Sequence, residues 1–137
     1  MVKDIFILGS TGSIGLSTLR VLKKDKKNFK IKLLTTNKNV KKILNQAINF
    51  KVKNIVIFDK SKFLKYEQNF IKNKIKVFYS LEDALKKISK KSFLTINAIS
   101  GIDGLEPSLN IIKYSNNLAI ANKESIICGW KFLQREL

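Results

Sequence analysis

Histidine is absent from this chain of 137 residues. Without it the chain has no Ser-His-Asp or Cys-His arrangement for nucleophilic catalysis, and the commonest zinc ligand is missing. The single cysteine, Cys128, cannot form an internal disulfide, which favours a reducing compartment. Any chemistry must therefore rest on lysine, on carboxylates, on a cofactor or on groups outside the chain.

Long apolar runs are missing too. No stretch is apolar for long enough to span a membrane, so we expect no membrane partner. Lys3 and Asp4 lead directly into the first predicted strand, without the apolar region of a signal peptide. These features favour the cytoplasm. The length suits one domain with a hydrophobic core better than two.

Acidic residues are scarce, with 10 against 27 lysines and arginines, which gives a formal net charge of +17. Such a charge invites a nucleic-acid function. However, only Arg20 and Arg135 are arginines, and arginine is the residue that base readout and bidentate phosphate contacts favour. The lysines are also scattered along predicted helices instead of forming one stripe. We therefore expect no nucleic-acid partner.

Glycine is concentrated at the start of the chain. Residues 4–8 are apolar and β-prone, which predicts a buried strand, and they run directly into the sequence Gly-Ser-Thr-Gly-Ser-Ile-Gly at positions 9–15. The apolar face expected for the following helix consists of Ile14, Thr18, Val21 and Leu22.

Glycines at a strand-to-helix turn let the backbone approach a pyrophosphate, and the helix N-terminus supplies free N–H groups. We expect the hydroxyls of Ser10, Thr11 and Ser13 to supplement these donors. The spacing G-x-x-G-x-x-G matches the dinucleotide fingerprint only in part. A purely structural turn is the alternative.

Strand and helix patterns alternate along the rest of the chain. Further strands are predicted at residues 29–34, 55–58, 75–79, 93–99 and 118–121, with helices between them and a last helix at about 124–137. This order predicts an α/β fold, a Rossmann-like doubly wound and mostly parallel sheet with helices on both faces. Ligands are then expected at the carboxyl ends of the strands.

The end of the second strand bears on the choice of cofactor. Sites that prefer NAD place an acid there to bind the ribose 2′-hydroxyl. Residues 34–39, Leu-Thr-Thr-Asn-Lys-Asn, contain no acid, whereas Lys38 suits a 2′-phosphate. The pattern favours NADP, although Lys38 could also be one more surface lysine.

The stretch Ala-Asn-Lys-Glu-Ser at 121–125 begins the last predicted helix. A lysine and a glutamate at the mouth of a sheet could bind a substrate phosphate and order the nicotinamide ribose. An N-capped helix with Glu124 in its first turn explains the same pattern equally well.

Together, residues 7–15, 99–109 and 121–125 resemble the 1-deoxy-D-xylulose 5-phosphate reductoisomerase family, and the resemblance covers essentially the whole chain. It implies conversion of 1-deoxy-D-xylulose 5-phosphate to 2-C-methyl-D-erythritol 4-phosphate in isoprenoid precursor synthesis. It also implies NADPH, a divalent metal (Mg²⁺ or Mn²⁺) and a homodimer.

The resemblance also implies roles for individual residues. The pyrophosphate and the nearby ribose would contact Thr11, Gly12, Ser13 and Ile14. The adenosine 2′-phosphate would lie at Asn37, Lys38 and Asn39, with Asn37 where many members carry glycine. The nicotinamide half would contact Asn122 and Glu124, and the substrate would contact Lys123.

The family's metal-binding Asp-x-Glu motif, its third metal carboxylate, its histidines and its active-site loop lie beyond the Asn-Lys-Glu helix. The chain ends before any of them, in a helix without a closing cap, so we assign it no catalytic residue and no metal ligand. We expect residues 1–137 to be the NADPH-binding N-terminal part of a longer enzyme, inactive by itself because the rearrangement needs the metal.

Two alternatives remain at this point. One is another G-x-x-G-x-x-G reductase, of the aspartate-semialdehyde or N-acetylglutamyl-phosphate type, with Cys128 as its nucleophile. Since no histidine is present to activate it, we expect Cys128 to be a buried and inert thiol. The other is a nonenzymatic module that binds nucleotides or nucleic acid, suggested by the charge.

Overall fold

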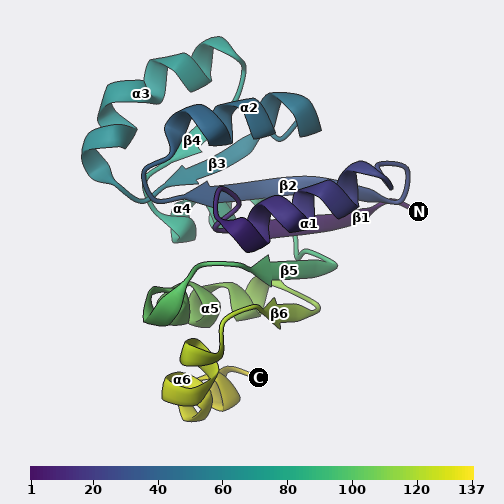
Figure 1. Ribbon diagram of the computed structural model, residues 1–137, viewed down its shortest axis with the longest axis vertical. Coiled ribbons are helices and arrows are strands. Elements are labelled where there is room, and N and C mark those ends of the chain that lie inside the picture. Colours follow the sequence, from purple (N-terminus) through teal and green to yellow (C-terminus); the bar gives the residue numbers. More distant parts are fainter.

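Six parallel strands form one sheet in the order β4-β3-β2-β1-β5-β6 (Figure 1). The computed structural model describes residues 1–137. Its strands are β1 (Lys3–Leu8), β2 (Phe29–Thr36), β3 (Asn54–Ile57), β4 (Lys76–Phe78), β5 (Leu94–Asn97) and β6 (Leu118–Ile120). Its α-helices are α1 (Ser13–Lys23), α2 (Val40–Phe50), α3 (Lys60–Lys72), α4 (Leu81–Ile88), α5 (Leu105–Ile111) and α6 (Lys123–Glu136). Two 3₁₀ turns, η1 (Gly101–Gly104) and η2 (Ile112–Tyr114), flank α5. The predicted fold class is confirmed.

Helices cover both faces of the sheet. On one face Leu19 of α1, Ile43 of α2 and Phe70 of α3 pack against the strands. On the other face Leu85 of α4 and Ile111 of α5 enclose a second, smaller core. The strands are apolar on both sides because each side is covered, as expected for a parallel sheet.

The winding of the chain changes direction at β1. From β1 the chain moves outward through β2 and β3 to β4, then returns to place β5 on the other side of β1. The helices that follow the neighbouring strands β1 and β5 lie on opposite faces of the sheet, α1 on one and α5 on the other. Such a switch point is where open α/β sheets bind their ligands.

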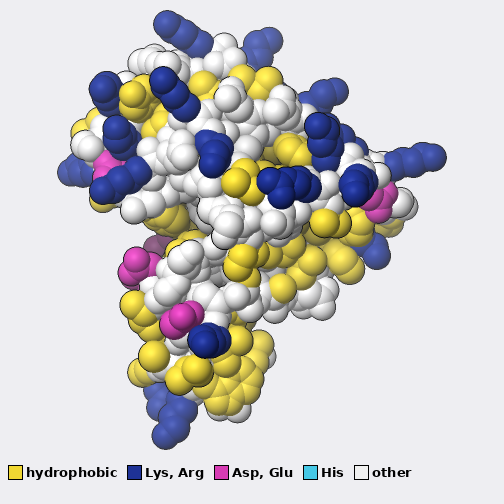
Figure 2. All heavy atoms as spheres, in the orientation of Figure 1, with side chains coloured by type: hydrophobic (Ala, Val, Ile, Leu, Met, Phe, Trp, Pro, Cys, Tyr) yellow, Lys and Arg dark blue, Asp and Glu magenta, His cyan; other side chains and the backbone are white.

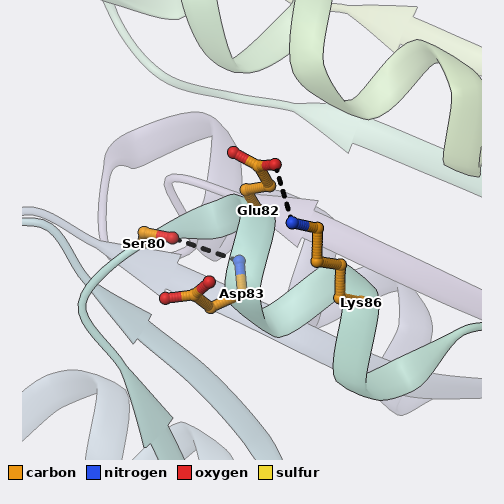
Figure 3. A network of polar contacts seen from close by, with 4 residues as sticks. All are labelled: Ser80, Glu82, Asp83 and Lys86. Atoms are coloured by element: carbon orange, nitrogen blue, oxygen red, sulfur yellow. Dashed lines mark hydrogen bonds and ion pairs between the residues drawn. The ribbon is translucent and has the colours of Figure 1, made fainter.

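Side-chain caps define the starts of four helices. At α4, the Ser80 hydroxyl accepts the Asp83 N–H at 3.1 Å (Figure 3). One turn further, Lys86 pairs with Glu82 at 3.0 Å, and this hydrogen bond raises the pKa of Lys86. Asn39, Asp59 and Asn122 cap α2, α3 and α6 in the same way. Helix α1 has no side-chain cap and no acid in its first turn, which leaves its N-terminus open.

The predicted apolar face of α1 is right for Leu22, which packs against the core, and wrong for Ile14 and Val21. Ile14 and Val21 are exposed, whereas Gly15 and Leu19 face the sheet. The reason is a close contact, since a methyl group at Gly15 would overlap the Gly9 carbonyl oxygen. This contact turns Gly15 inward, and the residue one turn later follows it.

Helix α6 lies at the β6 end of the sheet and buries only a narrow stripe, Ser125, Gly129 and Leu133. Hydrophobic side chains therefore gather on its outer surface (Figure 2). The exposed ones are Ile126, Ile127, Trp130 and Phe132. Cys128 is also exposed, so the prediction of a buried thiol is wrong. No helix in the structure has the length and hydropathy needed to cross a membrane.

Candidate functional site

The loop after β1 is held against the end of β2. The Gly9 N–H donates to the Thr35 hydroxyl at 2.9 Å, and the Ser10 N–H donates to the Thr35 carbonyl at 3.0 Å. Gly9 has a φ of +75°, and a methyl group there would lie 2.9 Å from the backbone nitrogen of Ile99. Glycine is therefore favoured here for two reasons: the turn has a positive φ at this residue, and the loop after β5 leaves no room for a side chain.

Gly12 differs from its two neighbouring glycines. A methyl group at Gly12 would meet nothing closer than the Gly9 carbonyl oxygen at 3.8 Å, an ordinary contact. The protein therefore has no internal need for glycine at this position. Open space beside the backbone is what a pyrophosphate requires, so the geometry supports the predicted role of Gly12.

Backbone donors at the start of α1 are free. The first hydrogen bond of the helix runs from the Leu16 N–H to the Gly12 carbonyl at 2.9 Å, and no bond within the chain uses the N–H groups of Ser13, Ile14 or Gly15. These groups lie at the positive end of the helix dipole. The arrangement is a ready anion site at the switch point of the sheet.

The three loop hydroxyls do not share one role. The prediction for Ser10 is wrong: its side chain is fully buried and donates to Gln46 Oε1 at 2.7 Å. Thr11 is half-buried and shares a hydrogen bond of 2.7 Å with the Thr36 hydroxyl. Ser13 is exposed at the first turn of α1. Only Thr11 and Ser13 are therefore accessible to a ligand.

The predicted 2′-phosphate residues form the exposed turn between β2 and α2. The Asn37 carbonyl accepts the Asp59 N–H at 3.0 Å, and Asn39 uses its side chain to cap α2. Lys38 is exposed and its ammonium makes no ion pair, since the two ion pairs of the chain are Glu82–Lys86 and Lys113–Glu136. The Lys38 ammonium is therefore available to bind an anion.

A pocket of about 600 Å³ extends from Asn37 across the carboxyl edge. Phe58 after β3, Tyr79 after β4 and Ile99 after β5 contribute to its walls. The sequence patterns did not single out these residues as candidates for a site, although each is the last residue of a predicted strand. The wall of the pocket also includes the carboxylates of Glu82, Asp103 and Glu106, so only its apolar and aromatic part suits a planar base.

The turn after β5 is fixed by two buried amides. The Asn97 amide nitrogen donates to the Gly104 carbonyl at 2.8 Å and to the Ser108 hydroxyl at 2.6 Å. The Asn122 amide nitrogen donates to the Ile99 carbonyl, and Asn122 Oδ1 accepts the Ser125 N–H at 2.8 Å. The capped-helix interpretation of Asn122 is confirmed. Its contact with a nicotinamide stays a prediction.

Lys123 and Glu124 are exposed in the first turn of α6. In the strand order β2-β1-β5-β6 they lie at one end of the carboxyl edge and Lys38 at the other, with the open start of α1 between them. The predicted residues are thus spread along one edge in the order an extended dinucleotide needs. Their individual contacts stay predictions.

A metal site does not form in this chain. No three or more carboxylate, cysteine or histidine groups come close enough together to hold a metal ion. The residues present therefore do not fit a resident divalent cation.

Comparisons with known proteins agree with this geometry. A family model described as 1-deoxy-D-xylulose 5-phosphate reductoisomerase matches residues 5–129. The reductoisomerase of Pelagibacter ubique is 51% identical over 140 residues, covering 99% of this chain and 36% of that protein. That of Campylobacter lari is 40% identical over 131 residues, covering 93% of this chain and 34% of that protein.

Solved structures show the same likeness. The reductoisomerase from Zymomonas mobilis in complex with NADPH has a TM-score of 0.86 and 28% identity, and the match covers 99% of this chain and 36% of that one. A reductoisomerase in complex with NADPH, fosmidomycin and magnesium has a TM-score of 0.87 and 25% identity, and the match covers 98% of this chain and 34% of that one.

The chain thus spans about 36% of the length of its curated relatives. These matches favour the predicted family over the semialdehyde-type reductases and the nucleic-acid module. The chain belongs to the 1-deoxy-D-xylulose 5-phosphate reductoisomerase family.

Proposed function

We propose that residues 1–137 are the NADPH-binding domain of an enzyme that rearranges and reduces 1-deoxy-D-xylulose 5-phosphate to 2-C-methyl-D-erythritol 4-phosphate. The observation that carries this proposal is the open N-terminus of α1, with its free N–H groups, at the switch point of the sheet. The relative solved with NADPH supports it.

The chain's own residues would hold the cofactor in an extended pose. Thr11, Gly12, Ser13 and Ile14 would bind the pyrophosphate, largely through backbone N–H groups. The 2′-phosphate would meet Asn37, Lys38 and Asn39, and the adenine would enter the pocket between Phe58 and Ile99. Asn122 and Glu124 would face the nicotinamide half. When bound, NADPH supplies the hydride for the reduction.

The substrate side would begin at Lys123, whose ammonium is exposed and suits an anionic phosphate. Since the residues here do not fit a metal ion, we propose that Mg²⁺ or Mn²⁺ and the catalytic residues come from the rest of a longer enzyme. Helix α6 begins at Lys123 and exposes an apolar surface. This surface supports the proposal that another part of the longer enzyme packs against α6, beside the substrate side of the site.

We also propose a cytoplasmic homodimer that does not bind nucleic acid. The high lysine content places positive charge over much of the molecule, including the face in Figure 2. Scattered lysines attract anions in general but present no single track for a phosphate backbone.

Fluorescence titration of the chain with NADPH tests the cofactor assignment. We expect saturable binding that survives moderate salt. A folded chain that binds random DNA with steep salt dependence, and does not bind NADPH, would overturn the proposal. Circular dichroism on the same sample establishes that the chain is folded.

A further inference from the structure

Asp59 brings a carboxylate next to the segment that the proposed function assigns to the 2′-phosphate. It is the first residue after Phe58 at the carboxyl end of β3, and its backbone N–H donates to the Asn37 carbonyl at 3.0 Å. This bond ties the start of α3 to the turn that carries Lys38. The sequence of β2 does not reveal this acid, because it comes from the neighbouring strand.

One oxygen of this carboxylate is occupied and the other is free. Oδ1 accepts the Ser61 hydroxyl at 2.7 Å and the Lys62 N–H at 3.0 Å. These hydrogen bonds, with a smaller contribution from the charge of Lys38, lower the pKa of Asp59, so the group is ionised at neutral pH. Oδ2 has no hydrogen-bond partner within the chain.

Lys38 forms no direct ion pair with this carboxylate. Its ammonium approaches no carboxylate within 4.0 Å, since the two ion pairs of the chain lie elsewhere. A dinucleotide with its 2′-phosphate at Lys38 would therefore lie near a positive and a negative group, which follow two adjacent strands. A 2′-phosphate is attracted by Lys38 and repelled by Asp59, whereas a ribose 2′-hydroxyl can donate to a carboxylate.

We propose that Asp59 is a specificity-determining residue that opposes Lys38 and narrows the preference of this site for NADPH over NADH. The inference rests on the proposed function and extends it. Two positions on different strands then set the choice of cofactor: Lys38 favours the phosphorylated ribose, and Asp59 favours the unphosphorylated one.

Asp59→Asn separates this role from helix capping. Asparagine caps a helix about as well as aspartate does, so the variant keeps the start of α3 and removes the charge. Asp25→Asn is the matched control, because it makes the same change of charge at the opposite edge of the sheet. Asp25 lies after the C-terminus of α1, where its carboxylate accepts the Asn28 amide at 2.8 Å.

The experiment measures the affinities of NADPH and NADH for the wild-type chain and both variants at low salt. We expect Asp59→Asn to tighten the binding of NADPH by about fivefold and not to tighten the binding of NADH. Asp25→Asn should leave the ratio of the two affinities unchanged. Equal shifts for both cofactors, or the same shift from Asp25→Asn, would overturn the inference while leaving the proposed function intact. A folded wild-type chain that binds neither cofactor overturns both.

Discussion

Gln46 on α2 and Ser10 in the loop after β1 form two hydrogen bonds with each other. The Ser10 hydroxyl donates to Gln46 Oε1 at 2.7 Å, and the Gln46 amide donates to the Ser10 carbonyl at 3.0 Å. Both side chains are buried. The second helix of the domain therefore holds the loop that leads to the proposed phosphate site.

Gln46→Leu should destabilise the fold by about 1–3 kcal/mol, because it leaves buried polar groups of Ser10 without their partner. It should also weaken NADPH binding by loosening the loop. Urea unfolding and cofactor titration measure the two effects. The double variant with Ser10→Ala should lose less stability than the sum of the single variants. A Gln46→Leu chain as stable as wild type contradicts this account.

Gly12→Val and Gly15→Ala should separate binding from folding. Gly12 has open space beside it, so valine should weaken the binding of either cofactor by crowding the pyrophosphate. The melting temperature of this variant should stay near that of the wild type. At Gly15 a methyl group meets the backbone of Gly9 and Ser10, and we expect a loss of about 1–3 kcal/mol. Thermal melts followed by far-UV circular dichroism measure the stability of each variant, and titrations with NADPH and NADH measure the affinity. A large melting loss in Gly12→Val at unchanged affinity would make that glycine structural.

Lys38→Glu should lower NADPH affinity by about tenfold or more and leave NADH nearly unchanged, because it sets a carboxylate against the 2′-phosphate. Lys27→Glu is the control, since this exposed lysine lies in the turn between α1 and β2, at the opposite edge of the sheet. Wild-type affinities that are equal for NADPH and NADH, and unaffected by Lys38→Glu, would rule out the 2′-phosphate assignment.

Cys128→Ser should preserve NADPH binding and the melting temperature. The thiol is exposed on α6, so it should react readily with a thiol reagent in the wild-type chain. Reactivity alone therefore does not identify a catalytic nucleophile here. Loss of cofactor binding after alkylation, absent in the serine variant, would point instead to a role for Cys128 near the cofactor.

The chain alone should not oxidise NADPH in the presence of 1-deoxy-D-xylulose 5-phosphate and Mn²⁺. The reason is that no cluster of metal-ligating side chains forms within residues 1–137. A longer chain, extended to the length of the relatives, should restore turnover, and in it Lys123→Ala should harm substrate use more than cofactor affinity. Turnover by the 137-residue chain would show that its acids do form a metal site.

Local patterns were enough to predict the fold. Apolar β-prone runs predicted the strands, and the caps of α2 and α4 at Asn39 and Ser80 are equally local signals, because capping depends on neighbours within one turn. The glycine loop was recognisable for the same reason. Its chemistry depends on backbone N–H groups, which a short segment specifies by itself.

Long-range contacts explain what the sequence could not show. The orientation of α1 follows from the contact of Gly15 with Gly9, and the burial of Ser10 follows from Gln46, which lies 36 residues away in the chain. Asp59 reaches the turn after β2 only through the pairing of two strands. Cys128 is exposed because Gly129 takes the inward position on α6.

The exposed side of α6 makes the intrinsic fluorescence of this protein a local probe. Trp130 is the only tryptophan and is half exposed on that helix, which lies beyond β6 at the end of the sheet. Its emission should follow the polarity around α6 and say little about the sheet. A shift to shorter wavelength would mark the covering of this helix by another surface, while the first strands could lose their structure without an equal change in the spectrum.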